Sequence, residues 1–145
     1  MALLWRSIWI TEGGSLDTEI SLFHYGYTLL EPTSVFNSLQ IASISDLACM
    51  KLEAIGSRGL KRDFFDLYTI CQLENWSLRK VLDFTIQKYQ RQTTDVPHLL
   101  KSLVYFDDAE TRPERAKIVD SVWEDVKKFF ITETNLILSG LIQRR

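Results

Sequence analysis

The sequence predicts an α+β protein, with a small β element over residues 1–43 followed by a mainly α-helical bundle over residues 44–145. Three observations support this prediction. Short runs of β-prone residues dominate before residue 43, and apolar residues recur at the helical spacing i, i+3, i+4 and i+7 after it. The composition, with 46% hydrophobic and 25% charged residues in a chain of 145, is typical of one soluble globular domain. We therefore expect a single domain built around one core.

The β element is expected to contain three short strands. A β-prone run over residues 5–10 ends at residues 13–15, Gly-Gly-Ser, which we interpret as a hairpin turn. Residues 19–25 form a second candidate strand, and residues 35–42 form a third. A sheet this small leaves apolar faces and strand edges uncovered, which predicts self-association or a covering partner. The apolar side chains concerned are Trp5, Ile8, Trp9 and Phe23.

Five helices are expected after residue 43. Ser43 and Asp46 have the spacing of a capping box, although Asp replaces the usual Glu or Gln, and Gly56 is expected to end the first helix. A loop over residues 56–59 should lead to a second helix with its apolar face at Phe64, Leu67, Tyr68 and Cys71. The later cap predictions are Ser77 for the third helix, Asp95 with Pro97 for the fourth, and Ser121 with Glu124 for the last, after a polar loop over residues 106–115.

Charge and cysteine content exclude several classes of function. Lys and Arg total 17 against 19 Asp and Glu, so the chain carries no strong nucleic-acid signal. Cys49 and Cys71 lack the spacing of a metal site and are expected to be buried apolar residues. The longest apolar stretch, residues 129–142, is too short and too polar to span a bilayer. Since no signal peptide is evident either, we expect a cytoplasmic protein.

Three charged side chains in the region of residues 46–72 have the pattern of a site. Lys51 falls at a position of the helical period where its apolar neighbours indicate burial, so its ammonium group must reach solvent or an anion. Asp63 and Asp66 are three residues apart near the start of the next helix and project to the same side. Acidic residues in a first turn also complement the helix dipole. The residues alone therefore leave both a structural ion pair and a catalytic group open.

A lysine-bearing helix, a loop with glycine and arginine, and the run Lys-Arg-Asp-Phe-Phe-Asp-Leu-Tyr follow one another over residues 46–72. This order resembles the signature of the AbiEii/AbiGii toxin-type nucleotidyltransferases. Residues 25–32 resemble the segment that precedes this signature in the family, and residues 98–110 and 123–130 resemble its C-terminal part. The resemblance covers most of residues 19–131.

The resemblance implies a DNA-polymerase-β-like fold, with the β element as a remnant of its sheet, and a reaction that uses Mg²⁺ and a nucleoside triphosphate. By this resemblance Lys51 would contact the phosphates, and Arg58 and Arg62 would lie beside them. Asp63 would face the reaction centre as a base or a metal-shell ligand, with Asp66 as its partner on the helix. Nucleotidyl transfer depends on positioning and charge stabilisation, which suits cations and carboxylates in this arrangement.

Other parts of the family pattern are missing. The resemblance implies a glycine–serine loop followed by paired carboxylates, but Asp17 and Glu19 follow residues 13–15 too closely for a strand to intervene. Ser21 stands where a further carboxylate is expected. Mg²⁺ requires oxygen ligands that include carboxylates. We therefore expect no metal site and no cofactor in this chain, which would be a catalytically incomplete C-terminal portion.

Three functional hypotheses follow. We favour a nucleotidyltransferase-family remnant with little autonomous catalysis; the alternatives are one half of a split enzyme and a helical interaction or regulatory module that binds a partner of an intact transferase. The expected partners are a second copy, the missing N-terminal half or an antitoxin-type protein, with weak nucleotide binding at best. A DNA-binding helix-turn-helix over residues 46–72 is disfavoured because the intervening loop is long and the net charge is −2.

Overall fold

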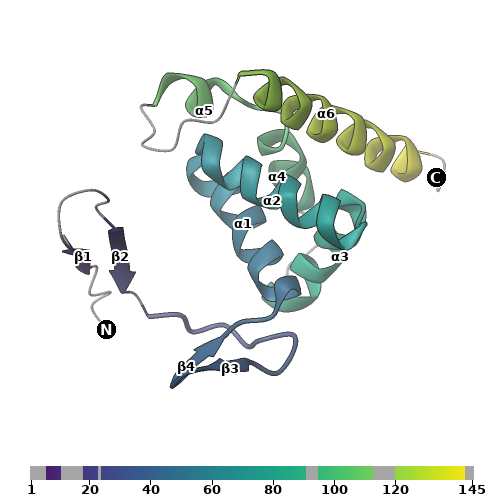
Figure 1. The fold of residues 1–145 in the computed structure, drawn as a ribbon. Helices are drawn as coiled ribbons and strands as arrows, with labels where there is room; N and C mark the ends of the chain where they lie inside the picture. The colour runs from purple at the N-terminus through teal and green to yellow at the C-terminus, as the bar shows by residue number, and fades with distance from the viewer. Residues whose placement is uncertain (1–5, 11–17, 23, 91–94, 113–119, 143–145) are drawn as a thin grey trace.

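The protein is α+β, with two small antiparallel hairpins ahead of a helical bundle (Figure 1). The computed structural model describes residues 6–10, 18–22, 24–90, 95–112 and 120–142. The elements in this part of the chain are β1 (Arg6–Ile10), β2 (Thr18–Leu22), β3 (Ser34–Phe36), β4 (Leu39–Ile41), α1 (Ile44–Arg58), α2 (Lys61–Glu74), α3 (Leu78–Tyr89), α4 (Val96–Ser102), α5 (Asp107–Thr111) and α6 (Asp120–Ile142). This architecture confirms the predicted fold class.

The first hairpin pairs β1 with β2, with Arg6 opposite Leu22 and Ile10 opposite Thr18. Figure 1 shows it standing clear of the helices. Its predicted turn, residues 13–15, lies outside the described residues, as do Trp5 and Phe23. The segment that follows, residues 24–33, attaches the hairpins to the bundle through contacts with α1 and α3.

The prediction of one strand over residues 35–42 is wrong, because this stretch is a second hairpin. β3 and β4 pair with Ser34 opposite Ile41 and Phe36 opposite Leu39. Between them Asn37 adopts a left-handed conformation, with φ 49°. Asn tolerates this conformation better than most residues because its short polar side chain bonds locally. The turn lacks the glycine that usually marks a tight hairpin, which is why the sequence pattern did not reveal it.

The first helix is longer than predicted. Ser43 caps it as expected, since its side chain accepts the Asp46 N–H. However, α1 continues through Gly56 and ends at Gly59, which takes the left-handed conformation at φ 56° and donates its N–H to the Ala54 carbonyl. Gly56 is instead a point of close approach, because a Cβ there would lie 3.0 Å from Leu99 Cδ2 of α4.

The later helices confirm some caps and correct others. Ser77 caps α3 as predicted, by accepting the Lys80 N–H. Asp95 stands at the cap position of α4, but its side chain makes no capping bond. The predicted polar loop contains α5, and α6 begins at Asp120, so Ser121 lies inside the helix rather than at its cap.

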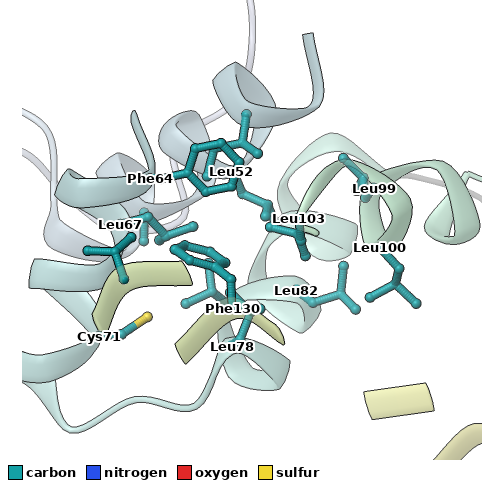
Figure 2. Packing of buried hydrophobic residues seen from close by; sticks show 14 of the residues in the cluster. Leu52, Phe64, Leu67, Cys71, Leu78, Leu82, Leu99, Leu100, Leu103 and Phe130 are labelled. Carbon is teal, nitrogen blue, oxygen red and sulfur yellow. The ribbon is translucent and has the colours of Figure 1, made fainter. Parts of the chain in front are cut away.

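The core lies between α1, α2, α3, α4 and α6 (Figure 2). Phe64 of α2 is at its centre, with its ring edge-on to Phe130 of α6 at a centroid distance of 5.1 Å. The apolar face predicted for α2 is confirmed: Phe64, Leu67 and Cys71 are buried and Tyr68 packs against the cluster. Within the described residues, none of the helices combines the length and apolar character that a membrane span requires.

Candidate functional site

Lys51 meets the two acidic residues that the sequence placed near it. Its Nζ atom lies 2.5 Å from Asp66 Oδ2 and 3.5 Å from Asp63 Oδ1. The Lys51 side chain is 29% exposed, the Asp66 side chain is 43% exposed, and the Asp63 side chain is fully buried. The lysine therefore reaches an anion from a half-buried position, as predicted, and part of its side chain stays accessible to solvent.

Arg58 holds the buried carboxylate of Asp63 from the other side. Its Nε donates to Asp63 Oδ2 at 2.8 Å, and its Nη2 donates to Oδ1 at 2.9 Å. Such a two-point contact is the strong, oriented form of an arginine–carboxylate pair. The left-handed turn at Gly59 makes this contact possible. The turn leads the chain from Arg58, the last residue of α1, into α2 within two residues.

We call this group, Lys51, Arg58, Asp63 and Asp66, the α1–α2 charge cluster. The contacts described here bring together four of the five residues that the resemblance indicated. The fifth, Arg62, precedes Asp63 in the first turn of α2, and its side chain is exposed. With two cations and two carboxylates the cluster is formally neutral.

The described residues do not fit a Mg²⁺ site by themselves. Both oxygens of Asp63 accept hydrogen bonds from Arg58, and Asp66 is engaged by Lys51. Mg²⁺ prefers an octahedral set of oxygen ligands that includes free carboxylates. Among the residues that the structure describes, no three His, Cys, Asp or Glu side chains gather closely enough to hold a metal ion. What the cluster offers chemically is two cationic side chains that are partly exposed.

Sequence reasoning missed a second charged site, formed by Asp46 and Lys88. The Lys88 ammonium donates to Asp46 Oδ1 and, at 3.0 Å, to the carbonyl of Thr28, and both charged side chains are fully buried. Asp46 also accepts the Leu30 N–H at 2.9 Å. The sequence signal was the same as for Lys51, namely a lysine at an apolar position of the helical period. Lys88 lies seven residues after the buried Val81 and so falls on the inner face of α3.

The hydrogen bonds of this pair keep both groups ionised. Burial works to raise the pKa of Asp46, but the bonds from Lys88, the Leu30 and Glu31 N–H groups and Ser43 hold it below its ordinary value of 3.8. Burial likewise works to lower the pKa of Lys88, and its bond to Asp46 raises it above 10.5. The pair is therefore a fixed structural tie between α1 and α3.

Three tyrosines surround this tie. The hydroxyl groups of Tyr25 and Tyr89 lie 2.9 Å apart, and the Lys88 ammonium sits 5.2 Å from the centre of the Tyr25 ring. The Tyr27 ring packs edge-on against Tyr89 at a centroid distance of 4.7 Å. Burial, followed by the hydrogen bond with Tyr25, raises the pKa of Tyr89, so this phenol stays neutral and does not act as a base.

The two thiols have no features of a nucleophile. Cys49 and Cys71 are both buried, as predicted. Burial, with a smaller contribution from Glu133, raises the pKa of Cys71 to about 12, and burial also raises that of Cys49. A reactive cysteine requires a lowered pKa and access to solvent. The α1–α2 charge cluster is therefore the better candidate for function.

Comparison with known proteins identifies the family of this chain. Residues 16–136 match the family described as nucleotidyl transferase AbiEii toxin of a type IV toxin–antitoxin system. The chain belongs to the AbiEii nucleotidyl transferase toxin family. Every residue of the cluster lies within the matched range. The resemblance stated from the sequence is thus confirmed.

A relative from Aquifex aeolicus (strain VF5), described as an uncharacterised protein, is 40% identical over 114 residues. The match covers 77% of this chain but 53% of the relative, so the chain spans about half the length of that relative. No solved structure matches the chain.

Proposed function

We propose that this AbiEii-family chain carries the phosphate-contacting part of a nucleotidyltransferase site, and that by itself it does not complete nucleotidyl transfer. The observation that carries the proposal is the α1–α2 charge cluster. Lys51 and Arg58 converge on the buried Asp63 while their own side chains remain 29% and 40% exposed. Cations oriented in this way can hold a phosphate group, which requires charge and position rather than covalent chemistry.

Each member of the cluster has a distinct role in this proposal. Lys51 binds a phosphate oxygen, and Arg58 and the exposed Arg62 add positive charge beside it. Asp63 fixes the direction of both Arg58 and Lys51. Asp66, which is the more exposed of the two carboxylates, competes with phosphate for Lys51 in the free protein.

Transfer also needs the charge of a nucleoside triphosphate to be neutralised and an attacking hydroxyl to be aligned. The carboxylates of the cluster are occupied by Lys51 and Arg58, so they do not position a metal ion for that step. Activity then depends on acidic residues from another polypeptide segment. The family is described as a toxin of a toxin–antitoxin system, so we also propose a cognate antitoxin as the partner that opposes the complete toxin.

Incubation of the purified chain with Mg²⁺, each labelled nucleoside triphosphate and total RNA tests this proposal. We expect no labelled product above the background of a reaction without protein. A labelled product that the Lys51→Ala or Asp63→Ala variant no longer forms would show that the chain is a complete transferase. The control variant is Lys80→Ala, which removes a lysine from the first turn of α3, next to the opposite end of α2.

A further inference from the structure

The hairpin of β3 and β4 exposes an unusual amount of apolar surface. Val35, Phe36, Leu39 and Ile41 are 74%, 63%, 68% and 42% exposed. In the observed register Phe36 lies opposite Leu39, and Ile41 is two residues further along β4, so these three side chains share one face. Single exposed apolar residues are common, but an apolar face on a two-stranded hairpin marks a contact surface.

This face continues into the side of α1 that carries the charge cluster. β4 leads through the Ser43 cap directly into α1, whose first residue, Ile44, is 43% exposed. Ile44, Lys51 and Arg58 are spaced by seven residues, which places them along nearly the same side of a helix. Since a helix rises 1.5 Å per residue, Lys51 lies about 10 Å beyond Ile44 along the axis. A polypeptide segment that binds the hairpin and extends along this side of α1 would therefore reach the cations of the cluster.

We infer that this surface docks the segment of the family polypeptide that has no counterpart in this chain. The surface is defined by Phe36, Leu39, Ile41 and Ile44, and we call it the hairpin face. The occupant is represented by the part of the Aquifex relative outside its match, which is nearly half of that protein. The inference rests on the proposed function, because the occupant would be the segment that completes the site at Lys51 and Arg58.

Co-expression of this chain with the unmatched part of the Aquifex relative tests the inference. We expect a complex of one copy of each, measured by light scattering after size-exclusion chromatography. The double variant Phe36→Lys/Leu39→Lys should weaken the complex at least ten-fold, because both side chains lie on the hairpin face. The control Leu73→Lys removes an equally exposed leucine, 79% accessible in the last turn of α2, and should leave the complex intact.

Hydrogen exchange on the unaltered chain gives a second readout that does not depend on how the variants fold. The amides of residues 34–44 should exchange more slowly in the complex than in the free chain. Failure to recover a complex, or a complex insensitive to the double variant with unchanged exchange at residues 34–44, would overturn the inference. Self-association of the chain through the same residues would overturn it in favour of a second copy.

The proposed function is measured separately, by nucleotide binding to the chain alone. If Lys51→Ala weakens nucleotide binding but no complex forms, the docking inference fails and the proposed function stands. If the complex forms and Lys51→Ala has no effect on nucleotide binding, the proposed function fails.

Discussion

Asp46 and Lys88 join three parts of the chain at one buried point. Asp46 lies in the first turn of α1 and Lys88 in the last turn of α3. The backbone of residues 28–31 donates to Asp46 and accepts from Lys88. Burying two charges is costly, and the cost is offset here because each oxygen of Asp46 has hydrogen-bond donors and Lys88 has two acceptors. Replacing either Asp46 or Lys88 alone should therefore lower the free energy of unfolding by more than the intact pair contributes to it.

We expect Lys88→Met to lower the free energy of unfolding by about 3–5 kcal/mol, because it leaves the Asp46 carboxylate buried without its counter-charge. Urea denaturation followed by circular dichroism measures this change. The matched control is Lys80→Met, at an exposed position of the same helix. It should change stability by less than about 1 kcal/mol, the most that the contact of Lys80 with the Trp76 ring contributes at such a site. Equal effects of the two variants would show that the buried pair contributes no more than a surface lysine.

Acid should weaken the fold through Asp46. Its pKa in the folded protein lies below the ordinary value of 3.8, so the ionised form stabilises the fold above about that pH. This contribution is lost as the pH falls through the folded pKa. As the pH falls below about 3.8, we expect the free energy of unfolding to decrease less steeply in Asp46→Asn than in the wild type. Urea titrations at a series of pH values check this, with Asp83→Asn, at an exposed position of α3, as the surface control.

At the residue scale, the sequence predicted one of the two charge sites. Lys51 could be found because a lysine among apolar helical positions must meet an anion, and Asp63 and Asp66 were its nearest acidic candidates. The roles of Arg58 and Arg62 came from the family resemblance. The Asp46–Lys88 tie could not be predicted as a pair, because its members are 42 residues apart and meet only when α1 and α3 pack.

At the scale of elements, the turn between α1 and α2 controls the geometry of the site. Gly59 has φ 56°, a conformation that L side chains adopt at a cost of about 1–2 kcal/mol. Gly59→Ala should therefore destabilise the protein by that amount and disturb the contact of Arg58 with Asp63. Gly140→Ala in α6 is the matched control: a Cβ there meets nothing within 4 Å, so it should stabilise the helix by up to about 1 kcal/mol.

Urea denaturation of both glycine variants measures the two effects. Opposite signs for Gly59→Ala and Gly140→Ala would support the assignment of Gly59 as the helix terminus. A neutral or stabilising Gly59→Ala would contradict it.

Helix positions were predictable because the apolar period from residue 44 onward is strong and Ser43 and Ser77 are good caps. The predicted end at Gly56 was wrong because glycine serves two purposes that local sequence does not distinguish. It can terminate a helix, as at Gly59, or admit a neighbouring helix, as at Gly56 beneath Leu99. The β3–β4 turn was missed because Asn37 takes the left-handed conformation without a following glycine.

At the scale of the whole molecule, a well-packed helical bundle carries a poorly covered β part. Figure 1 shows both hairpins outside the bundle, with β3 and β4 near the start of α1 and with β1 and β2 farther from the helices. The hairpin face is exposed, and the match spans about half of the Aquifex relative. A chain with this distribution of surface is suited to assemble with another polypeptide segment, and the α1–α2 charge cluster lies along the same side of α1.

In the proposed function, Lys51 binds phosphate and the Asp66 carboxylate competes with phosphate for it. Titration calorimetry of a nucleoside triphosphate without metal, at low ionic strength, tests this most directly. We expect Lys51→Ala to weaken binding about ten-fold, which corresponds to the loss of about 1.4 kcal/mol. Asp66→Asn should tighten binding because it removes the competing carboxylate, and Lys80→Ala should leave it unchanged. Equal affinities for the wild type, Lys51→Ala and Asp66→Asn would contradict the claim.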